Sequence, residues 1–146
     1  MKKAIIYYQS KTGTTKAYAE AIGSYLQSKN LDAAWHDISE HQPQPDADTD
    51  LILAGCWTKG LMVVMQHPAS DWNRFARNLA VPGNSKVALF TTYKIRTGSM
   101  FRKMAKQLDH KEIPVASSLK SKDGRISDHD RKILDDLIHS REKRSL

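Results

Sequence analysis

Two periodicities of apolar residues alternate along the chain. Short apolar runs or alternations, typical of strands, are separated by segments in which apolar residues return every three or four positions, as on one face of a helix. The first kind indicates strands over 3–9, 31–38, 51–56, 87–90 and 113–119. The second indicates helices over about 13–29, 68–80 and 101–108, and from Ser127 onward. The pattern therefore predicts strands and helices in alternation.

This alternation predicts a three-layer α/β domain, doubly wound around a five-stranded parallel sheet with right-handed crossovers. A length of 146 residues suits one such domain with one core. Pro114 near the start of the last strand is tolerable at a sheet edge. Ser127 and Asp130 form a capping-box pattern at the start of the last helix. Gly23 inside the first helix indicates close packing on the sheet, and the basic tail after residue 140 is expected to fray.

A hydroxyl-rich turn lies between the first strand and the first helix. Backbone N–H groups and the positive end of a helix converge at such a turn, which is an arrangement that binds phosphate. Four hydroxyl groups can donate to a phosphate, and a glycine lets the backbone approach closely. A helix N-cap is the alternative explanation. The turn consists of Ser10, Lys11, Thr12, Gly13, Thr14 and Thr15. No ATP-type phosphate loop ending in Gly-Lys-Ser/Thr is present.

The turn resembles the phosphate loop of the flavodoxin family, Ser/Thr-x-Ser/Thr-Gly-x-Thr, at every defined position. The resemblance extends over nearly the whole chain and implies the strand order 2-1-3-4-5, with FMN at the switch point between strands 1 and 3. It implies that the loop holds the monophosphate of FMN mostly without a cationic side chain. Lys11 falls on a variable position of the family pattern, so we expect it to be solvated.

The loop after the third strand reads Gly55-Cys56-Trp57-Thr58-Lys59-Gly60. Flavodoxins place a Thr here, then an aromatic residue on the flavin ring, then often Gly; Thr58 and Gly60 fit this pattern, but Lys59 stands at the aromatic position. Trp57 is expected either to cover the flavin or to shield the core. Cys56 is expected to pack or to touch the flavin edge, because a low-molecular-weight phosphatase would need Arg where Met62 stands. The apolar run 61–65 that follows indicates a lip for flavin, substrate or partner.

The loop after the fourth strand is the third part of the expected site. Flavodoxins surround the pyrimidine end of the ring here with backbone donors and an aromatic residue. Tyr93 is the aromatic candidate, and its alternative role is to cap the strand. The resemblance also assigns cofactor contacts to Thr91, Thr92, Thr97 and Gly98. A receiver domain is excluded, because Gln9-Ser10 and Gly55-Cys56 stand where that family needs carboxylates.

The net charge of +7 departs from typical acidic flavodoxins. Lys94, Arg96, Arg102, Lys103 and Lys106 gather beside the third loop, as a solvated helix face or as a docking patch for an acidic protein. We expect no nucleic-acid binding, because no recognition motif accompanies the charge. We expect no metal site and no membrane span. A single cysteine suits a reducing cytoplasm.

These features predict a non-covalent FMN-binding protein that carries single electrons between redox partners, with no catalytic side chain. One alternative is an FMN-dependent NAD(P)H or quinone reductase, for which the run 61–65 would build the pocket. Another is a flavodoxin-like protein that has lost FMN. The oligomeric state and the identity of the redox partners stay open.

Overall fold

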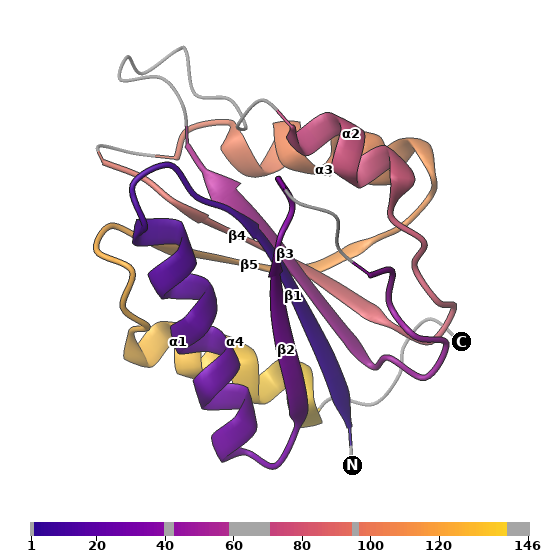
Figure 1. Cartoon of the computed structure of the whole chain (residues 1–146), viewed down its shortest axis with the longest axis horizontal. Coiled ribbons are helices and arrows are strands. Elements are labelled where there is room, and N and C mark those ends of the chain that lie inside the picture. The colour runs from indigo at the N-terminus through magenta and orange to yellow at the C-terminus, as the bar shows by residue number, and fades with distance from the viewer. Residues whose placement is uncertain (1, 40–42, 59–70, 95–96, 140–146) are drawn as a thin grey trace.

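The computed structural model describes residues 2–39, 43–58, 71–94 and 97–139. They form a five-stranded sheet in the order β2-β1-β3-β4-β5, in which each neighbouring pair is parallel. Helices cover both faces, which gives three layers (Figure 1). The doubly wound α/β fold expected from the sequence is thereby confirmed. The elements are β1 (Lys3–Gln9), α1 (Thr14–Ser28), β2 (Asp32–Asp37), β3 (Leu51–Trp57), α2 (Trp72–Asn78), β4 (Lys86–Thr92), α3 (Met100–His110), β5 (Val115–Ser121) and α4 (Asp128–His139).

The last strand begins at Val115 and not at Ile113, and it ends at Ser121 and not at Leu119. The Ile113 N–H donates to the Leu108 carbonyl at 2.9 Å, so this residue ends the turn after α3. Pro114 has no N–H to give to a ladder, so the strand starts after it. The helix expected over 68–80 is α2, which is shorter and spans Trp72–Asn78. Residues 68–70 and the tail from 140 lie outside the described part of the chain.

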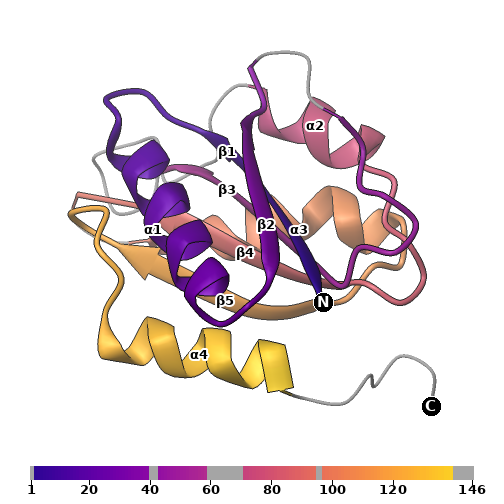
Figure 2. The ribbon, with the colours of Figure 1, turned by 60° about the horizontal axis from the view of Figure 1, so that its bottom comes forward.

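The two faces of the sheet bury different cores. On one face α1 and α4 cover Ile6 and Leu53, and on the other α2 and α3 cover Tyr7 and Ile52 (Figure 2). All four strand residues are fully buried. Successive residues of β1 and β3 thus face opposite cores, which explains why these central strands are apolar on both faces.

The connection from β2 to β3 contains no helix in its described residues, 38–39 and 43–50. The Pro43 carbonyl accepts a hydrogen bond from the Tyr7 hydroxyl at 2.7 Å. Gln44 reaches the end of α2, where its Nε2 donates to the Asn78 carbonyl at 3.0 Å and its Oε1 accepts from the Ala80 N–H at 2.8 Å. Side-chain bonds therefore hold an irregular segment that its prolines keep from being helical.

The expected capping box at the start of α4 is confirmed. The Ser127 N–H donates to Asp130 Oδ2 and the Asp130 N–H donates to Ser127 Oγ, both at 3.1 Å. Asp130 is buried and also accepts a bond from the buried Tyr18 hydroxyl of α1 at 2.8 Å. Burial, followed by the charge of Asp130, raises the pKa of Tyr18, so this hydroxyl stays protonated as a donor. The cap thus also joins α4 to α1.

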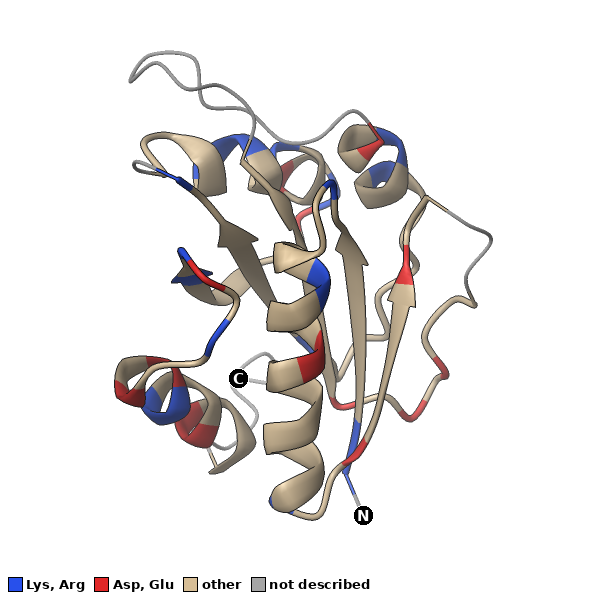
Figure 3. Ribbon diagram, turned by 60° about the vertical axis from the view of Figure 1, so that its left-hand side comes forward, with Lys and Arg blue, Asp and Glu red and all other residues tan. Residues whose placement is uncertain are grey.

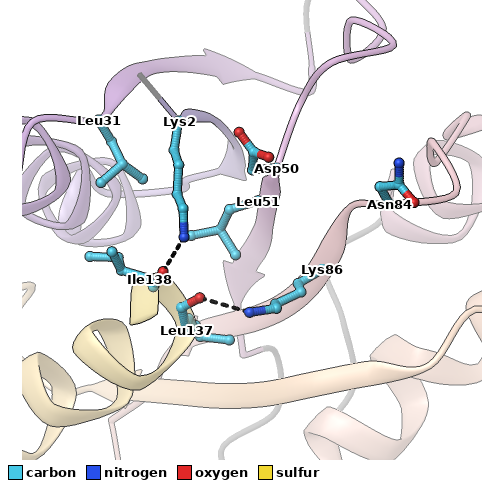
Figure 4. A pocket seen from close by; sticks show the side chains of 8 residues that line it. All are labelled: Lys2, Leu31, Asp50, Leu51, Asn84, Lys86, Leu137 and Ile138. Atoms are coloured by element: carbon cyan, nitrogen blue, oxygen red, sulfur yellow. Dashed lines mark hydrogen bonds between the residues drawn. The ribbon is translucent and has the colours of Figure 1, made fainter. Parts of the chain in front are cut away.

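Two lysines hold the other end of α4, at the edge of the sheet where the strands begin. Lys2 Nζ donates to the Ile138 carbonyl, and Lys86 Nζ donates to the Leu137 carbonyl at 3.0 Å (Figure 4). Their positive charges complement the negative end of the helix dipole. The lysines border a hollow of about 100 Å³ that Leu31, Asp50, Leu51 and Asn84 also line.

Gly23 of α1 allows Trp35 of β2 to lie against the helix backbone. A Cβ at position 23 would stand 2.3 Å from Trp35 Cε3, well inside the contact distance of two carbon atoms. The close packing expected at this glycine is therefore present.

Replacing Gly23 with Ala should lower the free energy of unfolding. Helix propensity favours Ala by about 1 kcal/mol, but displacing the Trp35 ring costs about 1–3 kcal/mol. We expect a net loss of about 1 kcal/mol, measured by urea unfolding. Gly83→Ala is the matched control, because nothing lies within 4 Å of a Cβ there. An unchanged or raised stability of Gly23→Ala would show that Trp35 moves aside without cost.

Candidate functional site

The carboxyl ends of β1, β3 and β4 lie side by side in the sheet. Gln9 pairs with Cys56, and Trp57 pairs with Thr92. The segments that follow these strands therefore leave the sheet at one level, where the order of the chain reverses around β1 (Figure 1). This is the place at which open α/β sheets bind ligands. The three loops selected from the sequence thus start from one edge.

Gly13 turns the first loop into α1. It adopts a φ of 96°, a left-handed conformation that favours glycine, and its N–H donates to Ser10 Oγ at 2.9 Å. The helix has no side-chain cap bond and no acidic residue in its first turn. Nothing lies within 4 Å of where a Cβ on Gly13 would stand. The positive end of α1 is therefore open on this side, an arrangement suited to an anion.

The threonines of this loop divide into two groups. Thr12 is exposed and Thr14 is half-buried, and their Oγ1 atoms lie 3.5 Å apart. Thr15 is buried, with 1% of its surface exposed, and its Oγ1 lies 2.6 Å from Oγ1 of Thr92 at the end of β4. Sequence reasoning missed this bond, because the two residues are 77 positions apart. Thr15 thus ties the loop to the sheet.

A second pair of hydroxyl groups joins the ends of β3 and β4. Oγ1 of Thr91 donates to the Cys56 carbonyl at 2.6 Å, and Oγ1 of Thr58 lies 2.9 Å from that of Thr91. A hydroxyl has one hydrogen, so Thr58 is the donor to Thr91. The Thr58 N–H also donates to the Thr92 carbonyl at 2.9 Å. These bonds fix the start of the loop after β3.

The candidate residues at the end of β3 differ in burial. Cys56 is fully buried and packs in the core on the α2–α3 face, whereas Trp57 is half-buried at the edge of that core. The Lys11 ammonium lies over the Trp57 ring, 5.1 Å from its centre. Such a cation–π contact is worth about 0.5–1 kcal/mol at an exposed site. Lys11, expected to be solvated, is exposed and in addition rests on Trp57.

Tyr93 continues β4 and is half-buried; its N–H donates to the Ser121 carbonyl of β5 at 3.2 Å. Lys120 and Lys122 place their ammonium groups 5.9 and 5.7 Å from the centre of its ring. Thr97 and Gly98 lead into α3, whose first residue donates its N–H to the Thr97 carbonyl at 2.9 Å. Candidates Lys59 and Gly60, the run 61–65 and Arg96 lie outside the described residues.

A fourth segment, residues 121–125 after β5, reaches the first loop. Ser121 Oγ accepts from the Gly124 N–H at 3.0 Å and donates to the Arg125 carbonyl at 2.9 Å. Gly124 has a φ of 83°, and a Cβ on it would stand 2.9 Å from the Thr14 carbonyl. Sequence reasoning missed this segment, although Asp123-Gly124 is a common turn signal.

Gln9, at the end of β1, carries the one buried side-chain polar atom that lacks a partner among the described residues. Its Nε2 donates to Asp71 Oδ2 at 3.2 Å, which orients the amide and leaves Oε1 as an acceptor. A buried acceptor of this kind requires a donor. Sequence reasoning used Gln9 only to exclude a receiver domain.

Comparison with protein families adds a decisive observation. The model of the flavodoxin domain matches residues 5–119, which is most of the chain. The chain belongs to the flavodoxin family. Proteins of this family bind flavin, typically FMN. A comparison with curated proteins gives no match.

Solved flavodoxins share the fold. A flavodoxin from the domain Archaea is 23% identical, with a TM-score of 0.64 over 92% of both chains. Two-electron reduced Megasphaera elsdenii flavodoxin is 21% identical, with a TM-score of 0.70 over 92% of this chain and 96% of the other. Oxidised flavodoxin 1 from Bacillus cereus is 18% identical, with a TM-score of 0.67 over 95% and 99%. At these identities the likeness concerns the fold.

The residues at the carboxyl edge fit FMN in this flavodoxin-family chain. The open start of α1 beside the Thr12 and Thr14 hydroxyls suits a phosphate monoester. Half-buried Trp57 and Tyr93 offer flat apolar surface for a ring system. The unpartnered Gln9 Oε1 is available to an N–H or O–H donor.

The Thr15–Thr92 bond should appear as a coupling energy in a double-mutant cycle. Either Thr→Val change leaves the other hydroxyl buried without its partner, at a cost of about 1–3 kcal/mol. The double variant leaves neither hydroxyl, so its cost should be smaller than the sum by about 1 kcal/mol or more. Urea unfolding of the four proteins measures this difference. Strictly additive costs would show that the bond contributes nothing to stability.

Proposed function

We propose that this flavodoxin-family chain binds FMN non-covalently and carries single electrons between redox partners. The observation that supports this most strongly is the open start of α1, where no side-chain cap and no acidic residue competes for the helix N–H groups. A phosphate monoester is the ligand that such a helix start suits best. In this proposal Trp57 at the end of β3 and Tyr93 just after β4 cover a flat ring.

Bound FMN would supply the one-electron redox chemistry. In the proposed site Ser10 keeps the loop closed by accepting the Gly13 N–H. Thr12 and Thr14 donate their hydroxyl hydrogens to phosphate oxygens. Thr15 anchors the loop through Thr92.

The remaining candidates have supporting roles in the proposal. Trp57 and Tyr93 exclude water from the ring, and the Thr58–Thr91 pair holds the loop ends that carry them. Cys56 packs beneath as a core residue, fully buried. Lys59, Gly60, Thr97 and Gly98 stay predicted contacts from the family pattern.

The proposed partners are redox proteins with an acidic docking surface. Exposed Lys94, Arg102 and Lys106, with half-buried Lys103, give the side of α3 a positive charge next to the third loop. Positive charge of this kind speeds the encounter with an acidic partner. Among the described helices none is long and apolar enough to span a membrane.

The absorption spectrum of the purified protein tests the cofactor. We expect flavin absorption bands. Acid or heat should release the flavin as free FMN, since the binding is non-covalent. As an electron carrier the protein should keep these bands when NAD(P)H alone is added, and lose them when a flavodoxin reductase is added as well. Rapid bleaching by NAD(P)H alone would instead identify a reductase, and a protein that stays colourless with added FMN would overturn the proposal.

Replacing Thr12 and Thr14 with Val should weaken FMN binding and leave the fold intact. Each hydroxyl bond to a charged phosphate contributes about 1.5–3 kcal/mol, so the loss should reach at least about tenfold in Kd. Riboflavin has no phosphate and serves as the matched ligand, with nearly unchanged affinity. Fluorescence titration of both flavins measures the two constants. Equal losses for FMN and riboflavin would place the phosphate elsewhere.

A further inference from the structure

Four exposed lysines surround the candidate site, and we call them the lysine rim. Lys11 comes from the loop after β1, Lys94 follows Tyr93 after β4, and Lys120 and Lys122 stand at the end of β5. Three of them were not part of the basic patch expected from the sequence. The rim therefore combines segments that are distant in the chain and adjacent in the fold.

Aromatic side chains of the site hold three of these lysines in place. Lys11 lies over Trp57, with 5.1 Å between ammonium and ring centre. Lys120 and Lys122 lie over Tyr93 at 5.9 and 5.7 Å. A ring holds an ammonium group without neutralising its charge. These lysines therefore lose less side-chain entropy when a partner binds them than free lysines would.

The positive charge of the lysine rim is largely uncompensated by acidic side chains. The ion pairs that the described residues form belong to Lys3, Arg74 and Arg131, not to a rim lysine. Asp123 is the acidic residue next to Lys122, and its Oδ1 accepts from the Arg125 N–H. The Arg125 N–H lowers the pKa of Asp123, which stays ionised as part of the turn. Asp71, which contacts Gln9 at the same edge, is paired with Arg74, so Asp123 and Asp71 do not offset the four lysines and the rim stays positive.

Three acidic residues lie at the opposite edge of the sheet, together with Lys2, Lys3 and Lys86. Exposed Asp46, Asp48 and Asp50 precede β3, where Lys3 pairs with the first two. In Figure 3 red segments lie along the chain that leads into β3 and also on the helices, α4 above all, and blue segments lie near the ends of β4 and β5. A charge distribution of this kind orients an approaching acidic partner before contact.

We propose that the lysine rim is the docking surface for the carboxylate-rich face of a redox partner protein. This rests on the proposed electron-transfer function, because the rim stands on Trp57 and Tyr93, the residues proposed to cover the flavin. It also changes the surface expected from the sequence. Of Arg102, Lys103 and Lys106 in α3, Lys106 lies furthest from this edge, because each residue adds about 1.5 Å along a helix that begins at Met100. Docking on the rim places the partner directly over the site.

A binding experiment with poly-L-glutamate as the acidic probe distinguishes the two surfaces. One variant carries Lys94, Lys120 and Lys122 as Gln, and the matched control carries Arg102, Lys103 and Lys106 as Gln. Both lose three positive charges from the same +7. We expect the rim variant to raise the Kd about tenfold or more, and the control to raise it by less than about threefold. Equal losses, or a larger loss in the α3 variant, would overturn the proposal.

Electron transfer to charged oxidants tests whether the rim guides partners to the flavin. Dithionite-reduced holoprotein is mixed with ferricyanide, which takes one electron per ion and becomes ferrocyanide. At an ionic strength of about 0.01 M the rim variant should react about tenfold more slowly, and near 1 M the difference should vanish. A cationic cobalt(III) phenanthroline complex should oxidise it no more slowly than the wild type. A slowing shared by both oxidants would show local damage and would count against docking.

The two proposals can fail separately. Absence of flavin bands, together with rim-dependent binding of poly-L-glutamate, would contradict the electron-transfer function. The same result would support the lysine rim as a surface that binds an acidic partner. Bound FMN, together with poly-L-glutamate binding that does not depend on the rim, would support the electron-transfer function. It would contradict the proposal that the rim is the docking surface.

Discussion

The parallel register of β1, β3 and β4 is the constraint on which the rest of the structure depends. Side chains alternate between the faces of a sheet, so a slip of one residue would exchange Ile6 and Tyr7 between two different cores. The same register sets Gln9, Cys56 and Thr91 at one level. The loops that follow must then meet. Burial on both faces thereby positions the candidate site at the carboxyl edge of the sheet.

Hydroxyl bonds continue this order beyond the strands. The bonds from Thr15 of α1 to Thr92 of β4, and from Thr58 after β3 to Thr91 of β4, join three segments at distances of 2.6 and 2.9 Å. Where water is excluded such bonds are strong, and removing one of the two partners is costly. Around Gly13, by contrast, the protein leaves open space. A rigid hydrogen-bonded base beside an open helix start is the arrangement expected of a binding site that is preorganised for its ligand.

Local patterns predicted most of the fold. Apolar runs located the strands, Ser127 with Asp130 predicted the cap of α4, and Gly23 predicted close packing, because each depends on residues near in the chain. The family resemblance supplied the strand order. Contacts between distant segments could not be predicted: a lysine has the same local sequence whether it is solvated or rests on a ring. The missed contacts are Thr15 with Thr92, Lys11 with Trp57, and the β5 lysines with Tyr93.

The bonds between α1 and α4 govern how the chain is completed during synthesis. Tyr18 and Tyr25 of α1 bond to Asp130 and Asp135, which follow them by 112 and 110 residues. A chain grows from its N-terminus, so the first helix leaves the ribosome long before these partners exist. Until then the apolar face of α1 lacks α4, and long-range closure of this kind is slow. The segment that carries the phosphate-loop sequence is thus synthesised well before the helix that covers it, so its apolar face is exposed in the nascent chain.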